Sequence, residues 1–293
     1  MKNIGYILVL SILLFSSCVR DEIEPCPPLT VSITVKDKNY FNVDKVALEN
    51  RKSEDLAFKE YVPTLYYQLR DAVTGEVVEE QGVFNVTSDE KEYPITFCDC
   101  IPHGKYVLTV WGGLSDNTPL GDDPLTAILH EENTENGDYY MTNDTLVYDA
   151  WNYDYIAKME RTKGKLIIQV ENLPEKVNYS DKAVNGLYGQ LNCEFQYSDA
   201  ITVRTQAEWG KSSEVITKTI LSPSIKKDGS LVGVNFYDTP DRITPVLIPE
   251  AVNITMERNR LTVLRYVYDG NDFTIYVLVN DNWEEINGLI VGE

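Results

Sequence analysis

The chain has 293 residues, with 26 lysines and arginines against 46 aspartates and glutamates, and a formal net charge of −20 at pH 7. This charge repels nucleic acid phosphates, so nucleic acid binding is excluded. The length exceeds what one small core usually organises, which predicts two domains. Tyr, Val, Ile and Thr are plentiful and helical spacing is absent, so we expect an all-β fold of antiparallel sheets.

The first segment indicates secretion. An apolar run over residues 4–15 is too short to span a membrane and leads through two serines into Cys18. The sequence FSSC resembles the lipobox of bacterial lipoproteins, in which the chain is cut directly before an acylated cysteine. We therefore expect residues 1–17 to be a signal peptide and Cys18 to carry palmitate or a similar acyl chain. The alternatives are a chance cysteine after an ordinary signal peptide and an uncleaved membrane anchor.

Residues 18–28 are charged and proline-rich, which is typical of a tether. Several acyl chains together would make its anchoring effectively permanent, since each buried methylene contributes roughly 0.8 kcal/mol. Arg20, Asp21 and Glu22 resemble the export signal of Bacteroidetes surface lipoproteins. The expected location is therefore the cell outer membrane, with the protein exposed at the surface.

Strand patterns begin directly after the tether. Residues 29–36 alternate between apolar and polar side chains, which predicts a half-buried antiparallel strand. Residues 38–62 are open to two interpretations, a short helix or an extended loop. Residues 64–73 and 76–86 flank Thr74-Gly75 and predict a hairpin, because glycine allows the positive φ of a tight turn.

Two further strands are expected at residues 91–100 and 104–111, and the second is apolar on both faces, which indicates a central strand. Residues 112–138 are rich in Gly, Asp, Asn and Pro and predict a long surface excursion. Its aspartates at 116, 122 and 123 have the oxygens that calcium prefers, but they match no EF-hand spacing, so a solvated acidic loop is favoured.

A domain boundary is expected near residue 160, which gives a β-rich N-terminal domain over residues 29–160 and a β-rich C-terminal domain over 161–293. In the second half, residues 191–198 alternate and would point Cys193 inward as a buried thiol. Two hairpins are predicted there, one from residues 215–221 and 230–237 around Asp228-Gly229, the other from residues 261–268 and 273–279.

The remaining cysteines are able to pair outside the cytoplasm, and a disulfide from Cys26 to Cys98 or to Cys100 is one possibility. No catalytic motif, phosphate-binding loop or dinucleotide fingerprint occurs, so we expect neither an enzyme nor a cofactor or metal. Residues 139–155 carry six aromatic side chains. They predict strand packing, with a sugar-stacking platform as the alternative.

Several stretches together resemble the FimB/Mfa2 family of Bacteroidales fimbrial anchor proteins. They are the lipobox at Cys18, CPPLTVSITVKDKNYFNVDKV from residue 26, CIPHGKYVLTVWGGL from residue 100 and GKLIIQVENLP from residue 164. The resemblance implies two transthyretin-like β-sandwiches, held by lipid at the base of a fimbrium, that end or regulate pilus assembly and contribute to cell adhesion.

The resemblance also implies a partner, a major or accessory fimbrial subunit that binds by strand addition. In that mode main-chain hydrogen bonds at a sheet edge supply affinity and side-chain pockets supply specificity. The short sequence after residue 279 favours an acceptor over a donor of a strand. The competing hypothesis is a surface glycan-binding lipoprotein of a polysaccharide-utilisation system, with the aromatic residues 139–155 as its platform.

Overall fold

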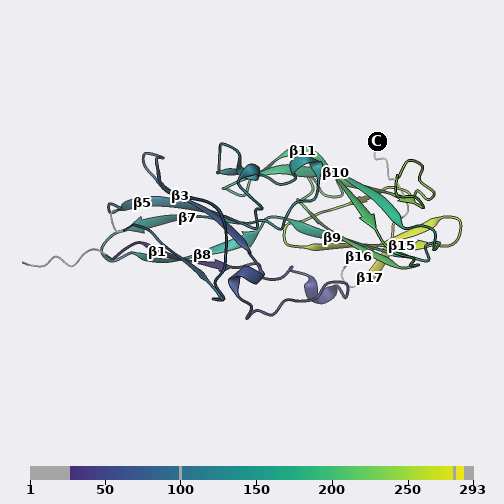
Figure 1. Cartoon of the computed structure of the whole chain (residues 1–293), viewed down its shortest axis with the longest axis horizontal. Helices are drawn as coiled ribbons and strands as arrows, with labels where there is room; N and C mark the ends of the chain where they lie inside the picture. The colour runs from purple at the N-terminus through teal and green to yellow at the C-terminus, as the bar shows by residue number, and fades with distance from the viewer. Residues whose placement is uncertain (1–26, 99–100, 280–281, 287–293) are drawn as a thin grey trace, which may run out of the picture.

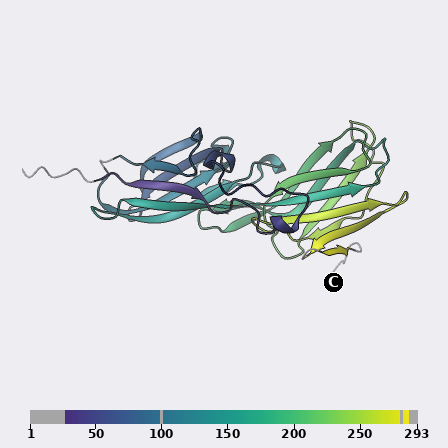
Figure 2. The ribbon, with the colours of Figure 1, turned by 90° about the horizontal axis from the view of Figure 1, so that it is seen from below.

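The computed structural model describes residues 27–98, 101–279 and 282–286. Within these residues every regular element is a β-strand or a single turn of 3-10 helix. The predicted all-β class is therefore confirmed. Figures 1 and 2 show an elongated molecule in which two groups of strands follow one another along the longest axis. We call them the N-terminal sandwich and the C-terminal sandwich.

The N-terminal sandwich is one seven-stranded sheet folded into two layers. In spatial order its strands are β3 (Val77–Asn85), β2 (Thr64–Asp71), β5 (Gly104–Gly112), β7 (Tyr140–Tyr148), β8 (Asp154–Arg161), β1 (Thr30–Val35) and β4 (Tyr93–Thr96). The layers join where β7 pairs with β8 through Tyr140 and Met141. Buried side chains such as Ile33, Leu108 and Leu146 fill the space between them. Their burial, at roughly 25 cal/mol per Å² of apolar surface, holds the layers together.

The predicted hairpin, central strand and alternating first strand of this sandwich are confirmed, but one pairing is not. β2 and β3 form the predicted hairpin, with Gly75 at φ +75°, and β5 lies between β2 and β7 as a central strand. β1 alternates as expected, but it pairs antiparallel only with β4 and runs parallel to β8. The expectation of a purely antiparallel strand is wrong because β8 returns to β1 from more than 120 residues away, and alternation does not encode direction.

The C-terminal sandwich consists of two five-stranded sheets. The first contains, in order, β11 (Tyr197–Glu208), β10 (Tyr179–Asn192), β13 (Ser230–Tyr237) and β14 (Val252–Ile254), with β6 (Thr126–Ile128) paired to β10. The second contains β12 (Val215–Leu221), β9 (Gly164–Glu171), β15 (Leu261–Tyr268), β16 (Phe273–Val279) and β17 (Asn282–Glu285). A second apolar core, which includes Ile168, Val234 and Tyr266, lies between the sheets.

Of the two hairpins predicted for this sandwich, one is confirmed and the other is wrong. β15 and β16 pair as expected around Gly270. β12 and β13 do not pair, because β12 bonds to β9 and β13 bonds to β10. Their connection crosses from one sheet to the other and is held by backbone bonds that include Ile225 N–H to Gly186 O in β10 and Ser224 N–H to Met256 O in the loop after β14. The turn at Asp228-Gly229 therefore belongs to a crossover.

The strand predicted over residues 191–198 is also wrong. β10 ends at Asn192 and β11 begins at Tyr197, so these residues form the tip of a hairpin. Asn192 Oδ1 accepts the N–H groups of Glu194 and Gln196, and Phe195 has φ +58°. Cys193 lies in this turn and is partly buried, with a free thiol. A side chain that bonds its own turn overrides the alternation.

Residues 112–138 leave the N-terminal sandwich but do not form a simple surface excursion. They contain β6, which pairs with β10 of the other sandwich. Leu120, Ala127 and Leu129 are buried in a cluster that also contains Trp111 and Leu191. The segment was misjudged because its polar residues are turn formers around a short apolar core, which only the second sandwich completes.

Residues 38–49 form a second contact, after β6, between the N-terminal half of the chain and the C-terminal sandwich. Within residues 38–62 the regular elements are two 3-10 turns, Val43–Lys45 and Phe58–Glu60, so the extended-loop interpretation holds. Tyr40, Val43 and Val46 pack on the outer side of the second sheet, against β9 and β15. This loop covers apolar surface that a separate C-terminal half would expose to water.

The connection between the sandwiches is buried. Arg161 is 4% exposed, and Thr162 and Lys163 are 0% exposed. The Arg161 guanidinium contacts Asp138 at 2.8 Å and Asn259 at 2.5 Å. Lys163 Nζ donates to the carbonyls of Leu129 and Gly137. Because a buried charge is costly unless it is paired or hydrogen-bonded, these contacts fix how the chain passes from one sandwich to the other.

Candidate functional site

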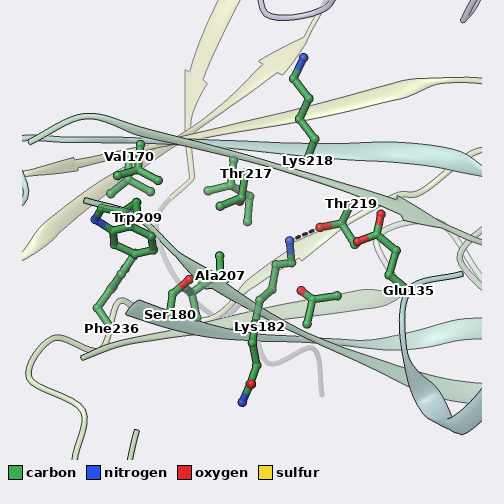
Figure 3. Close-up of a pocket in the computed structure, with 15 residues that line it drawn as sticks. Glu135, Val170, Ser180, Lys182, Ala207, Trp209, Thr217, Lys218, Thr219 and Phe236 are labelled. Carbon is green, nitrogen blue, oxygen red and sulfur yellow. Dashed lines mark hydrogen bonds between the residues drawn. The ribbon is translucent and has the colours of Figure 1, made fainter. Parts of the chain in front are cut away.

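The candidate site is a gap along one side of the C-terminal sandwich. β11 ends the first sheet and β12 ends the second, and the two strands face each other across the gap. A cavity of about 70 Å³ lies between them. We call this region the open seam. Figure 3 shows its walls, with residues from β10, β11 and β13 on one side and from β9 and β12 on the other.

The open seam has an apolar end and a polar end. Val170, Trp209 and Phe236 line the apolar end (Figure 3), together with Val215, which pairs with Val170. The polar end is lined by hydroxyl and charged side chains, which are Lys182, Thr205, Thr217, Thr219 and Glu135, and Ser180 lies nearer the apolar end, paired with Phe236. A cavity of this size has room for about two water molecules, which matches a polar group better than a whole side chain.

Lys182 is the unusual residue of the seam. Alternation along β10 buries Ser180, Lys182 and Val184 on the face between the sheets. The Lys182 side chain is 7% exposed, and its ammonium donates a hydrogen bond to Thr219 Oγ1 (Figure 3). Burial lowers the pKa of Lys182 to about 8, although the Glu135 carboxylate opposes that shift. An apolar residue is the usual occupant of such an inward position.

The edge of β12 is covered at one end. Glu135 accepts the N–H of Ile220 at 2.8 Å, and His130 Nε2 accepts the N–H of Ser222 at 3.0 Å. The proton of the ring therefore lies on Nδ1, which donates to Thr134 O at 3.0 Å. Burial, with the positive charge of Lys163, lowers the pKa of His130 to about 3 and keeps the ring neutral.

The other end of β12 remains available for pairing. Backbone direction alternates along a strand, so the N–H groups of Ile216 and Lys218 point the same way as that of Ile220, away from β9. The Lys218 side chain is exposed and pairs with Glu49 at 2.8 Å. An exposed edge of this kind is a template for an added strand.

Most of the lipidation, export-signal and disulfide residues predicted from the sequence lie outside the described part of the chain. These are Cys18, Arg20, Asp21, Glu22, Cys26 and Cys100. Cys98 is disulfide-bonded, and the predicted pairing of Cys26 with Cys98 or with Cys100 stays a prediction. In the described ranges no helix is both long and apolar enough to cross a membrane.

The aromatic side chains of residues 139–155 differ in burial. Tyr139, Tyr140 and Tyr148 are buried, whereas Trp151 is 89% exposed and Tyr153 is 39% exposed. The predicted packing role therefore holds for the buried three.

In the acidic loop, Asp116 and Asp123 accept backbone N–H groups two residues ahead. The described residues contain no group of three or more potential metal ligands.

The open seam was not predicted from the sequence. Its signal was the alternation of Ser180, Lys182 and Val184, which places a lysine on the same face as apolar residues. That face is only recognisable as a core position once the partners of β10 are known.

No family model matches the chain, and no curated protein sequence matches it significantly. Solved structures do resemble it. A "putative adhesin" from Bacteroides thetaiotaomicron is 15% identical, with 91% of this chain and 100% of that one covered, at a TM-score of 0.58. Another structure from that organism, described among "putative polysaccharide binding proteins", is 10% identical, with 89% and 98% covered, at a TM-score of 0.57.

The similar structures also include the fimbrial anchor protein Mfa2 from Porphyromonas gingivalis, at 13% identity. It covers 87% of this chain and 98% of its own, at a TM-score of 0.45. Identities this low establish the fold alone. The two structures from Bacteroides thetaiotaomicron confirm the β-sandwich architecture over nearly the whole chain.

Proposed function

We propose that this chain is a non-enzymatic outer-membrane lipoprotein that anchors a fimbria at the cell surface and ends or regulates its assembly, and thereby contributes to adhesion. In this proposal Cys18 carries the lipid and the open seam accepts an extended strand from the first fimbrial subunit. The observation that carries it is the open seam itself, where one end of the β12 edge has no strand partner among the described residues and lies beside a cavity between the two sheets.

Strand addition fits the geometry of the seam. A strand laid along β12 would bond the N–H groups of Ile216 and Lys218, for which the described residues supply no partner, and its alternate side chains would lie over the mouth of the cavity. The apolar end of the seam would take up apolar side chains of that strand, which adds the hydrophobic contribution. The capped end, at Ile220 and Ser222, would set where the added strand stops.

A proline at Ile216 tests the seam. It removes one outward N–H without touching the ladder to β9, and the exposed side chain leaves room for the ring. Pull-down of the surface protein from its own cells, followed by mass spectrometry, should recover fimbrial subunits with the wild type and at least tenfold less with Ile216→Pro. Ile216→Thr, which keeps the N–H, is the matched control. Equal recovery with the proline variant would contradict strand addition at β12.

Replacement of Cys18 by alanine tests the anchor. Cells that carry Cys18→Ala should release fibres into the medium, because the base of the fibre would lack its lipid. Electron microscopy and immunoblotting of the medium measure this release. Fibres that stay attached to cells would contradict the anchoring role and leave the seam proposal standing.

A second candidate function is favoured by one observation. Trp151 is almost fully exposed at the turn between β7 and β8, with Tyr153 close in the chain. Exposed aromatic rings stack on sugars. If the protein binds glycans, a glycan array should give binding that Trp151→Ala removes, and the pull-down should recover a transporter in place of a fimbrial subunit.

A further inference from the structure

The strongest unexplained feature of the molecule is a lysine inside the open seam. An ammonium group that leaves water loses several kcal/mol of solvation unless partners replace the water. Among the described residues the hydrogen-bond partner of Lys182 Nζ is Thr219 Oγ1. An ammonium has three N–H donors, so this bond leaves two without a protein acceptor in that part of the chain.

The surroundings of Lys182 suit an anion. The hydroxyl-bearing residues Ser180, Thr205 and Thr217 line the same cavity. Of the charged residues that line it, Lys218 points its side chain away from the cavity (Figure 3) and pairs with Glu49, and Glu135 lies at the exposed rim. Glu135 bonds the backbone of Ile220 and forms no ion pair with Lys182 in this structure. The positive charge deep in the seam therefore has no close negative partner among the described residues.

The cavity also limits the size of its ligand. Its volume of about 70 Å³ admits a carboxylate and not a large ring. A neutral amide or hydroxyl would satisfy the donors but would leave the charge uncompensated at low dielectric. A carboxylate supplies both acceptors and charge, and such charge-assisted bonds are roughly twice as strong as neutral ones.

We infer that the open seam is a binding site for an extended protein segment that carries one carboxylate, which seats against Lys182 Nζ. The inference rests on the proposed strand addition and specifies its partner. Inward side chains of a strand recur every second residue. The segment is therefore expected to carry an aspartate or glutamate with an apolar residue two positions away, and the apolar residue contacts the Trp209 and Phe236 end of the seam.

The test is a selection of displayed dodecapeptides on the full mature chain with Cys18→Ala, with a parallel selection on the same chain with Lys182→Met. The unaltered seam should enrich peptides with one acidic residue at a fixed spacing from an apolar residue. The Lys182→Met selection should lose the acidic residue and keep the apolar one. Lys182→Arg, which keeps the charge, should retain part of the acidic enrichment.

Affinity measurements then isolate the contact. For the best peptide, made with an amidated C-terminus, Lys182→Met in the protein and Glu→Gln or Asp→Asn in the peptide should each weaken binding at least tenfold. The two changes together should weaken it no further, because they remove the same contact. Loss of binding on amidation alone would assign the carboxylate to the end of the strand in place of a side chain.

The outcomes separate the two proposals. Peptides that bind without an acidic preference, or equally well to Lys182→Met, would overturn the carboxylate inference while strand addition stands. If no selected peptide loses affinity on Ile216→Pro, both proposals fail. Thermal unfolding of each variant, compared with the parent, confirms that a lost signal does not come from an unfolded sandwich.

Discussion

The two sandwiches close their sides in different ways. In the N-terminal sandwich, β3 and β4 are the two ends of one folded sheet, and Phe84 and Tyr93 bring their ring centroids to 5.6 Å between them. Tyr67 and Phe97 add an edge-to-face contact at 5.8 Å. In the C-terminal sandwich, β11 and β12 face each other across a cavity that contains Lys182.

The side chains between the two edge strands determine whether that side of a sandwich is closed or open. Aromatic side chains bury large areas and form favourable edge-to-face pairs, so they seal the N-terminal side. A buried lysine and several hydroxyl groups leave the C-terminal side less tightly packed and more costly in solvation. We interpret the first side as structural and the second as held open for a partner.

The largest effect is expected when the lysine is removed. The pKa of Lys182 is about 8 in the folded chain, against a usual value of 10.5. Between these values the unfolded chain binds more protons than the folded one, so this group makes stability rise as the pH rises. We compare the free energy of unfolding of the wild type with that of Lys182→Met. From pH 8 to pH 10.5 this difference should shift in favour of the wild type by up to about 3 kcal/mol.

Urea unfolding of both proteins across that range measures this difference. The tyrosines whose pKa is raised by burial act in the opposite sense above pH 10, but they are present in both proteins and cancel. At pH 7, Lys182→Met should be as stable as the wild type or more stable, because a buried charge gives way to an apolar group. A difference that does not change with pH would show that Lys182 is solvated in the folded protein.

The next effect concerns the sealed side. Phe84→Ala removes the ring that contacts Tyr67 and Tyr93, and we expect a loss of about 2 to 3 kcal/mol in the free energy of unfolding, below the range for a fully buried ring. Thr217→Ala, the matched truncation at the open seam, should cost less than about 1 kcal/mol. Urea unfolding followed by circular dichroism compares the two. Equal losses would mean that both sides are packed alike.

The smallest effect concerns the cap of β12. Glu135→Ala removes the acceptor for the Ile220 N–H at an exposed position, so stability should change by less than about 1 kcal/mol. Hydrogen exchange at Ile220 should nevertheless speed up several-fold, because the amide gains access to water. Glu135→Gln keeps an acceptor oxygen and should preserve the protection. If Glu135→Ala leaves exchange at Ile220 unchanged, the loop from the N-terminal half does not cover this edge.

The sequence was most informative where the signal is local. The alternation of β1, the two apolar faces of β5 and the turns at Gly75 and Gly270 all depend on a residue and its near neighbours, and the structure confirms them. The all-β class follows from the same local preferences. The resemblance of its longer stretches to fimbrial anchor proteins led to the β-sandwich architecture that the solved structures confirm.

Tertiary structure decided which strands meet. Alternation gives a strand two faces but names neither its neighbour nor its direction, so the parallel pairing of β1 with β8 and the separation of β12 from β13 were not foreseeable. The same limit concealed the bridge through β6 and the inward position of Lys182. These features depend on contacts between residues far apart in the chain, whose free energy is gained only when the whole fold forms.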